Sequence, residues 1–433
     1  MKRTSAIVLS ALALASVIAT DALAAQAGLL SLPGGAAADA GDATTEPTAL
    51  TAHSAEATDA PAGTPEADRS DETDDSDETD AESTDGENSA GETPAAEPVE
   101  IRSCTVIDSP GRYVLAADVE DAGADACIRI VASDVVLRGG GHAVDAAFDD
   151  RAADPSASRA GFGVVVGAEA ETVTNVTVAN LTAVDWGTGI KYENASESAL
   201  RNVTVRSADT GVLFYRTSDS VVADSVVTDT RRGEAVLLVS SDRNRLVGND
   251  VSGNDFDSFG GRARGVVLRG SSGNEIRWNT LAENNAGVHV EAASDGNEIA
   301  GNGFEISEMG GVAVRIAGSD GNAVRDNAFS VAGPGVSGVT AVEVVGSTGA
   351  VVENNALSAV DVTVSDSSTD VAVADNEVAD GTISVVRSAS DVSVTGNRIV
   401  DGRIYAGLGA TNVTVRDNDL VRSEVSVEDG AQS

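Results

Sequence analysis

The sequence predicts an all-β fold: a single right-handed parallel β-helix with coils of roughly 20–25 residues, preceded by a disordered acidic arm. Three observations support this. A short motif that ends in asparagine recurs through the second half of the chain. Segments around it alternate apolar and polar residues, as strands with one buried face do. Glycine, serine, aspartate and asparagine fill the gaps as turn formers, and no helical periodicity is present.

The repeat is clearest in NRLVGN (244–249), NEIRWN (274–279), NEIAGN (297–302) and NAVRDN (322–327). Later copies are VAVADN (371–376), VSVTGN (392–397) and VTVRDN (413–418). In the strand before the first copies, Val176 and Val178 should point inward and Thr177 outward. A second strand follows in each repeat, so each turn should contain two or three strands.

One column of the aligned repeats is predicted to be structural. Equivalent residues in stacked coils lie ~4.8 Å apart, so inward amides can hydrogen-bond from coil to coil and satisfy the turn backbone. The predicted members are Asn180, Asn249, Asn279, Asn302, Asn327, Asn355, Asn376, Asn397 and Asn418, with Ser207 and Ser225 in the same column.

The charge is strongly acidic. Asp and Glu number 69 against 28 Lys and Arg, the net charge is −41, and Lys2 and Lys191 are the only lysines. No basic surface is available to displace counterions from phosphate, which excludes a nucleic-acid partner. Self-repulsion of this size is screened in concentrated salt, so the composition predicts a salt-adapted protein.

The chain divides into four predicted segments. Residues 1–24 read as a secretory signal peptide, with a basic start, a short apolar run and an A-x-A site at 22–24. Residues 25–100 form a disordered acidic linker, 101–428 the β-helix and 429–433 a disordered tail. The mature chain should carry no membrane span and act as a secreted or cell-surface monomer.

Cys104 and Cys127 are the only cysteines. An even pair in a secreted chain predicts one disulfide, and closing this loop is worth ~3 kcal/mol in the chain-entropy model. A metal pair is the alternative, but no histidines lie nearby in sequence.

The start of the predicted β-helix resembles a known group. Residues 104–115 (CTVIDSPGRYVL), 127–130 (CIRI) and 135–145 (VVLRGGGHAVD) are similar to the opening coils of NosD-type and CASH-type right-handed β-helix proteins of archaeal secreted and surface origin. Arg138 stands where that pattern usually has aspartate. The resemblance implies the fold over about residues 101–428 and leaves the function open, because β-helices host many chemistries.

Copper chemistry does not carry over with this resemblance. The chain has only the histidines His53, His142 and His289 and the methionines Met1 and Met309, so soft copper ligands are missing. No cofactor is predicted, although Ca²⁺ is a candidate for acidic pairs.

The ligand site is predicted near residues 185–264. Trp186, Tyr215 and Phe259 are the candidate ligand-binding aromatics, while Asp255, Asp257 and Arg262 are weak candidates for catalysis or, for the two aspartates, Ca²⁺ binding. The alternative is that this loop covers an outward apolar strip of Leu213, Leu237 and Val267 and that its charges are solvated.

Two outward columns are predicted in the second strands. One contains Lys191, Leu213, Leu237, Val267, His289 and Ala313; the other contains Glu193, Tyr215, Val239, Arg269, Glu291 and Arg315. Glu291 should therefore pair with Arg269 and Arg315, and His289 should be a surface residue. Among five N-glycosylation sequons, Asn194 is the best surface candidate.

These patterns leave two functions open. The first is an extracellular module that binds carbohydrate or a cell-surface partner without catalysis. The alternative is a polysaccharide lyase or glycoside hydrolase with its groove near residues 185–264, although no catalytic signature of either class is present.

Overall fold

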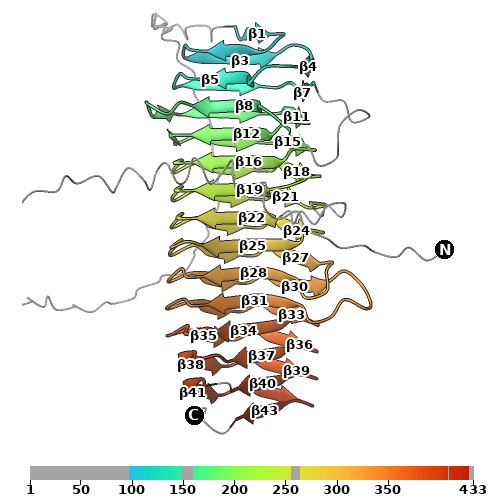
Figure 1. Ribbon diagram of the computed structural model, residues 1–433, viewed down its shortest axis with the longest axis vertical. Coiled ribbons are helices and arrows are strands. Elements are labelled where there is room, and N and C mark those ends of the chain that lie inside the picture. The colour runs from blue at the N-terminus through green and yellow to red at the C-terminus, as the bar shows by residue number, and fades with distance from the viewer. Residues whose placement is uncertain (1–96, 148–158, 255–263, 408, 429–433) are drawn as a thin grey trace, which may run out of the picture. The chain divides into compact units, whose positions relative to one another are not determined.

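The computed structural model describes residues 97–147, 159–254, 264–407 and 409–428. They form a stack of about 13 coils with three strands per coil, and no helix occurs among them (Figure 1). The predicted parallel β-helix is thereby confirmed, with three strands per turn. The predicted signal peptide, most of the predicted acidic linker and the predicted tail 429–433 lie outside the described residues.

The strands of each coil belong to three parallel sheets, labelled A, C and B in chain order. Sheet A contains β1 (Val99–Ile101), β3 (Gly111–Leu115), β6 (Val135–Arg138), β10 (Val176–Ala179), β14 (Ala199–Arg201), β17 (Val221–Ala223), β20 (Arg245–Val247), β23 (Glu275–Arg277), β26 (Glu298–Ala300), β29 (Ala323–Arg325), β32 (Val351–Glu353), β35 (Ala372–Ala374), β38 (Ser390–Thr395) and β41 (Thr411–Arg416).

Sheet C follows sheet A in each coil from β3 onward. Its strands are β4 (Val119–Ala122), β7 (Ala143–Ala146), β11 (Thr182–Val184), β15 (Thr204–Arg206), β18 (Val226–Thr228), β21 (Asp250–Val251), β24 (Thr280–Ala282), β27 (Gly303–Ile306), β30 (Ala328–Val331), β33 (Ala356–Ser358), β36 (Glu377–Ala379), β39 (Arg398–Val400) and β42 (Asp419–Val421).

Sheet B closes each coil. Its strands are β2 (Thr105–Ile107), β5 (Ala126–Ile130), β8 (Phe162–Gly167), β12 (Thr188–Glu193), β16 (Thr210–Tyr215), β19 (Glu234–Val239), β22 (Arg264–Arg269), β25 (Ala286–Glu291), β28 (Val312–Ala317), β31 (Thr340–Val345), β34 (Asp361–Ser365), β37 (Thr382–Val385), β40 (Arg403–Ala406) and β43 (Glu424–Val427). A short fourth sheet pairs β9 (Val173–Thr174) with β13 (Ala195–Ser196).

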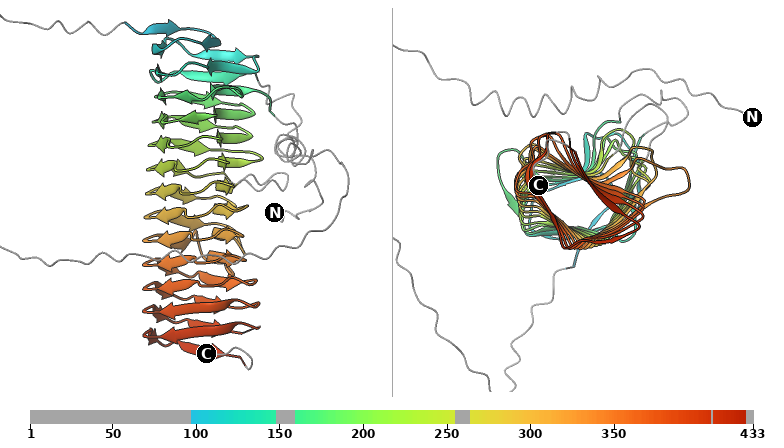
Figure 2. Two further views of the ribbon diagram at one scale, coloured as in Figure 1. Left: turned by 90° about the vertical axis from the view of Figure 1, so that its left-hand side faces the viewer. Right: turned by 90° about the horizontal axis from the view of Figure 1, so that it is seen from below.

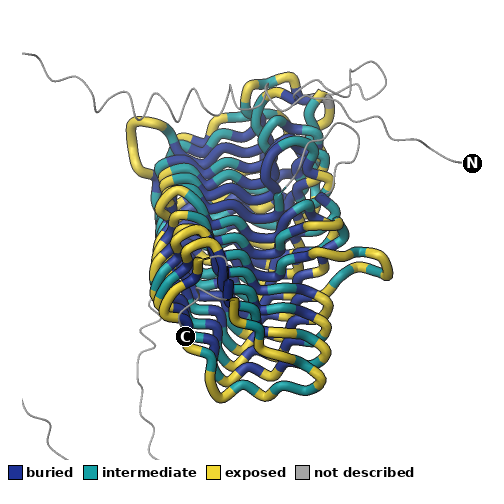
Figure 3. Tube along the Cα trace, turned by 60° about the horizontal axis from the view of Figure 1, so that its bottom comes forward, coloured by how far each residue is buried: buried dark blue, intermediate teal, exposed yellow. Residues whose placement is uncertain are grey.

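One apolar core fills the space that the three sheets surround (Figure 2). Along β10 the predicted alternation is confirmed, because Val176 and Val178 are buried and Thr177 is only partly so. The same alternation gives the rows of buried residues that run along the coils in Figure 3. Aromatic pairs add specific packing: Tyr192 and Phe214 lie 5.1 Å apart by ring centroid, and Phe304 and Phe329 stack at 4.8 Å.

The predicted asparagine ladder runs through the turns from sheet A to sheet C. In each step the backbone N–H and the side-chain amide of one asparagine donate to Oδ1 of the next, as from Asn279 to Asn302 at 2.9 and 3.0 Å. The spare amide proton goes to a backbone carbonyl, as from Asn279 to Leu246 O. Eight asparagines, Asn249 to Asn418, follow this pattern, and Ser225 donates into its first member, Asn249.

Asn180 was wrongly placed in this column. The strand register aligns Val178 with Leu200, so Leu181, one residue later, occupies the ladder position and is buried. Asn180 instead sits in the left-handed turn with φ 56° and accepts a hydrogen bond from Asn202 at 2.6 Å. Ser207 also lies outside the column, because it follows β15 in sheet C.

Three further polar ladders were not predicted as ladders. Asn244, Asn274, Asn297 and Asn322 bond in series before sheet A. Asn254 and Asn284 do so between sheets C and B. A serine column, which includes Ser271, Ser294 and Ser319, follows sheet B. All these residues are buried, so the ladders satisfy turn backbone that would otherwise cost free energy.

The predicted disulfide between Cys104 and Cys127 is confirmed, with a Cα–Cα distance of 4.3 Å. Cys127 is fully buried at the first coils of the β-helix. The bridge therefore ties β5 to the segment before β2. No helix in the described part of the chain has the length and apolar character to cross a bilayer.

Candidate functional site

The outward face of sheet B has three columns of side chains. The strand register aligns Glu234 with Arg264, Leu237 with Val267 and His289, and Val239 with Arg269 and Glu291. The predicted columns hold from Lys191 to His289 but are shifted by two residues in β28. There Arg315 follows His289 and Ala317 follows Glu291.

This shift changes the predicted salt ladder. Glu291 pairs with Arg269 at 2.8 Å and with Arg264 at 3.6 Å, whereas Arg315 contacts Glu343 at 3.5 Å. The expected Glu291–Arg315 pair is therefore wrong, because the two residues lie in different outward columns.

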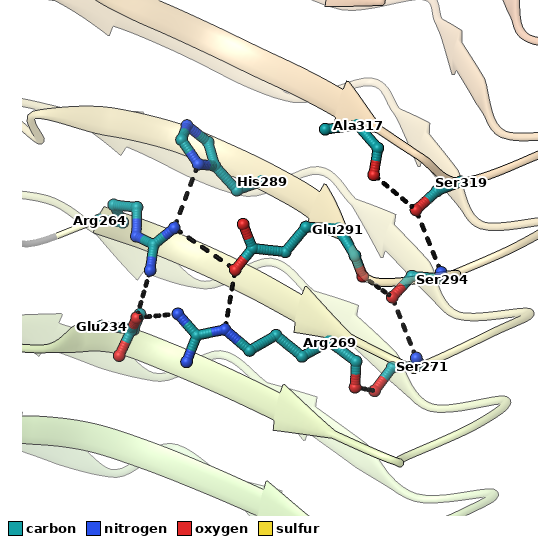
Figure 4. A network of polar contacts seen from close by, with 9 residues as sticks. All are labelled: Glu234, Arg264, Arg269, Ser271, His289, Glu291, Ser294, Ala317 and Ser319. Carbon is teal, nitrogen blue, oxygen red and sulfur yellow. Dashed lines mark hydrogen bonds and ion pairs between the residues drawn. The ribbon is translucent and has the colours of Figure 1, made fainter. Parts of the chain in front are cut away.

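A charge network closes around Glu234, the first residue of β19 (Figure 4). Its carboxylate accepts from Arg264 Nη2 at 2.6 Å and from Arg269 Nη2 at 2.9 Å, and its side chain is only 8% exposed. Burial lowers the pKa of Arg269, but Glu234 and Glu291 outweigh that effect and hold it above its usual value. Burial would raise the pKa of Glu291, yet Arg269 and Arg264 bring it below its usual range. Both partners are therefore charged at neutral pH.

His289 lies half-buried in this network, so it is less exposed than the surface residue that the sequence predicts. Its Nδ1 lies 3.3 Å from Arg264 Nη1, and its Nε2 is buried with no hydrogen-bond partner. Burial lowers the pKa of His289, and Arg264 lowers it further, to about 4. Because Arg264 only donates, the neutral ring must accept at Nδ1 and carry its proton at Nε2.

Two of the three residues of the predicted apolar strip are buried. Leu237 and Val267 point outward from sheet B but are 1% and 0% exposed, whereas Leu213 is half-buried. The predicted loop residues Asp255, Asp257, Phe259 and Arg262 lie outside the described residues, so their roles stay predictions.

A second buried cluster joins the turns between sheets C and B. Arg159 donates from its backbone N–H to Asp209 at 2.7 Å and from its guanidinium to Asp185 at 2.8 Å. Burial raises the pKa of Asp209, although the Arg159 hydrogen bond and the charges of Arg232, Arg159 and Arg231 oppose that rise. Sequence spacing gave no signal for this cluster, because Arg159 is 50 residues from Asp209.

Trp186 cannot bind a ligand through its ring. It is 1% exposed, it packs in the core, and its Nε1 donates to Val144 O at 3.0 Å. The assignment as a ligand-binding residue is corrected accordingly: the turn from sheet C to sheet B directs this position inward, as it does Asn254 and Asn284 three and four strands later in sheet C.

Tyr215, by contrast, lies half-buried on the outward face of sheet B. Arg216 Cζ lies 4.9 Å and Lys191 Nζ 5.8 Å from its ring centroid, and Lys191 also lies 5.4 Å from the ring centroid of Phe162. Lys191 in turn pairs with Glu193 at 2.8 Å. An accessible aromatic ring with cations beside it is therefore present at the predicted position.

Asn194 is less free than its sequon suggests. Its side-chain amide donates to Ala168 O at 2.9 Å and to Glu169 O at 3.0 Å. A glycan on that nitrogen would have to replace these hydrogen bonds, so its use stays a prediction.

The sequence gave no notice of Trp278, which is 62% exposed. It lies inside the repeat motif, one residue before the ladder asparagine Asn279, where the motif elsewhere has a small turn former. The residue type alone does not predict this exposure, because Trp186, the other tryptophan of the chain, is buried.

An open groove of about 630 Å³ lies over the last turns from sheet C to sheet B. Its lining includes Asp380, Asp401, Arg403, Arg422 and Glu424. Arg422 and Asp401 pair within it, and Gly381 and Gly402 also line it.

Part of this stack of coils matches a known protein family. The family model of NosD, described as a periplasmic copper-binding protein, matches residues 154–309. This segment of the β-helix is therefore similar to NosD in sequence. It contains Tyr215, Trp278, and the network around Glu234.

Copper does not fit the described part of the chain. No group of three or more His, Cys, Asp and Glu side chains that could hold a metal occurs among those residues. His142 bonds to Asp118, His289 Nδ1 faces the guanidinium of Arg264, and both cysteines are joined in the disulfide. The described residues of the segment that matches the NosD model therefore contain no copper ligand set.

Solved structures with similar folds are distant. DFA-IIIase from Arthrobacter chlorophenolicus A6 in complex with GF2 is 14% identical, with 56% of this chain and 60% of that chain covered and a TM-score of 0.43. The mannuronan C-5 epimerase AlgE4 A-module of Azotobacter vinelandii is 14% identical over 73% and 90%, with a TM-score of 0.41. The enzymatically active domain of tailspike protein 2 of bacteriophage CBA120 is 13% identical over 55% and 42%, at 0.42. No curated protein sequence matches the chain.

Proposed function

We propose that this protein is an extracellular module that binds polysaccharide without cleaving it, with Tyr215 as a contact residue. The proposal includes export directed by residues 1–24 and action as a monomer in concentrated salt.

The observation that carries this proposal is the ring of Tyr215 on the outward face of sheet B, with Arg216 at 4.9 Å and Lys191 at 5.8 Å. Aromatic faces with polar or charged neighbours suit a sugar ring, whose apolar face stacks while its hydroxyls form hydrogen bonds. A cell-surface protein is the alternative ligand at the same face.

The carboxylates near this face favour binding over catalysis. Glu234 and Glu291 are each held by two arginines, and an acid or base that works on a sugar needs a carboxyl free to exchange protons. An ionised carboxylate locked between guanidinium groups does not supply that proton.

The experiment uses the full secreted chain in molar NaCl with Ca²⁺ and a panel of neutral and acidic polysaccharides. Retention by the polymer and new chain ends are both measured. Retention that falls on Tyr215→Ala and persists in Tyr405→Ala supports the proposal. Tyr405 is a matched control, because it is a half-buried tyrosine on the same sheet with Arg403 Cζ 5.4 Å from its ring. Retention unchanged by Tyr215→Ala would contradict it.

Asp209 favours one second candidate, a polysaccharide lyase or glycoside hydrolase. Burial raises its pKa within the predicted 185–264 region, and a raised carboxyl pKa is what a general acid requires. New chain ends that disappear in Asp209→Asn, Asp255→Ala or Asp257→Ala would make the protein an enzyme. If Ca²⁺ removal abolishes either signal, the acidic pair Asp255 and Asp257 is the first place to look for the ion.

A further inference from the structure

Trp278 lies in the turn between β23 in sheet A and β24 in sheet C. It is the one aromatic residue among the large apolar side chains that are exposed in the described part of the chain. The equivalent position in other coils holds small or polar turn formers: Asn180, Asn202, Asp224, Gly248, Gly301, Asp326, Asn354, Asp375, Gly396 and Asp417.

This position is costly for an indole. The turn requires the left-handed backbone, and Trp278 has φ 56°. Left-handed backbone costs an ordinary L-residue roughly 1–2 kcal/mol, whereas glycine, asparagine and aspartate adopt it readily. Trp278 is the only aromatic residue with positive φ in the described ranges. Since the ring is mostly exposed, core packing does not compensate for this cost.

The neighbouring coils leave room for the ring. A Cβ added to Gly301, one coil further on, would lie 2.8 Å from Trp278 Cδ1 and 2.9 Å from its Nε1. The indole therefore rests along the backbone of Gly301, and only glycine permits this contact. On the other side, the equivalent residue is Gly248, which has no side chain to cover the ring. The open stretch extends over roughly 10 Å, two coil spacings.

Paired charges lie on the outward face of sheet A, on the strand that leads into this turn and on the next strands of the sheet. Arg277 pairs with Glu298 and lies 3.5 Å from Glu275, and Arg325 lies 3.2 Å from Glu353 and 3.6 Å from Glu298. Each arginine is matched by carboxylates, so this face offers planar hydrogen-bond donors and acceptors without an excess of positive charge. Such a surface does not attract a polyanion, but it suits the hydroxyls of an uncharged sugar.

We propose that Trp278, resting on Gly301 and directly following Arg277 of the Arg277–Glu298 pair, is a stacking platform for a neutral polysaccharide, separate from Tyr215. This inference rests on the proposed function and specifies its ligand class. The platform is on sheet A and its turn, whereas Tyr215 is on sheet B, so each can be removed without touching the other.

Fluorescence can report on this platform, because the two tryptophans of the chain differ in exposure. Acrylamide should quench Trp278 and leave Trp186 largely unquenched. In the full chain in molar NaCl, cellohexaose and mannohexaose are the neutral probes and hexagalacturonate is the acidic one. We expect at least one neutral probe to shift the emission to the blue and to protect it from acrylamide. If the neutral probes leave emission and quenching unchanged while binding to the chain is measurable by calorimetry, the platform is wrong.

The decisive variant is Trp278→Asn, which restores the residue type found at Asn202 and Asn354. It should weaken binding of the neutral probe at least about tenfold, while the melting temperature stays equal or rises because the backbone cost is removed. Trp278→Phe should retain most of the affinity. Val226→Asn, which replaces another exposed apolar residue on sheet C, is the matched control and should bind as the wild type does.

The outcomes separate the two proposals. Binding lost in Tyr215→Ala and kept in Trp278→Asn would leave the proposed function standing and overturn the platform. Binding lost in Trp278→Asn and kept in Tyr215→Ala would support the platform and overturn Tyr215 as a contact residue. Binding of hexagalacturonate alone would overturn the neutral ligand class, and no binding of any saccharide would overturn both proposals.

Discussion

The coils around β22 to β26 present arginine–glutamate pairs on two faces, and the two faces differ. On sheet B, Glu234 is 8% exposed, His289 is half-buried and the outward Leu237 is buried. On sheet A, Glu298 is 28% exposed beside an indole that faces solvent. The same residue types therefore serve as an enclosed structural network on one face and as the border of an accessible surface on the other. Exposure, and not composition, decides which of the two a charge cluster becomes.

Removing one carboxylate from each face should show the largest difference. Glu234→Gln leaves two arginines in an enclosed site short of a counter-charge, and we expect it to lower the free energy of unfolding by about 4 kcal/mol. Glu298→Gln removes a more exposed partner and should cost less than about 1 kcal/mol. Urea unfolding in molar NaCl compares them, and equal losses would show that the two faces are energetically alike.

The pH dependence should come from the enclosed face. His289 has a pKa of about 4 in the folded chain and about 6.5 when unfolded, so the unfolded state binds more protons between these values. Stability should fall as the pH drops from about 6.5 to 4, by about 3 kcal/mol in total, and should level off below that. His289→Gln should lose this part of the pH profile. An unchanged profile would mean that another group is responsible.

The contribution of a ladder asparagine to the free energy of unfolding should depend on its position along the axis of the β-helix. It should not depend on the difference between the two faces. Asn302→Ala removes the acceptor for the backbone and side chain of Asn279, both buried, and should cost about 2 kcal/mol. Asn418→Ala does the same to Asn397, but Asn418 itself is only partly buried, so about 1 kcal/mol is expected. Thermal unfolding of the two variants tests this, and a larger loss at Asn418 would contradict it.

One small expected effect has the opposite sign. Trp278→Asn should raise the free energy of unfolding by about 1 kcal/mol, because asparagine accepts the left-handed backbone better. Trp186→Phe makes the contrast, since it empties space in the core and removes the hydrogen bond to Val144, and should be destabilising. A loss of stability in Trp278→Asn would assign the exposed indole a structural role.

The parallel fold, the strand alternation and most of the ladder followed from the sequence, because a solenoid repeats one local rule and errors do not accumulate. The ladder position was predicted one residue too early at Asn180, because the first copies of the repeat have Leu181 and Val203 there in place of asparagine. Arg315 was placed two residues off because β28 begins at Val312, two residues later than the alignment of Gly311 with Gly287 predicts.

The site was less predictable than the fold. Whether a tryptophan is buried or exposed depends on which turn of the coil holds it, and Trp186 and Trp278 occupy different turns. The pairing of Arg159 with Asp185 and Asp209 brings together segments that no periodicity relates. Such contacts appear only once the coils are stacked.

The ladder also has a direction, and this bears on how the chain is built. Asn249 donates its backbone N–H and its amide to Asn279, which comes 30 residues later, and each later asparagine waits for its successor in the same way. A coil is therefore complete only after the next one has arrived. In a chain that emerges from its amino terminus, the last coil formed always has amide donors whose acceptors lie in the coil that has not yet folded. Each new coil supplies those acceptors, so the stack grows in one direction, one coil at a time.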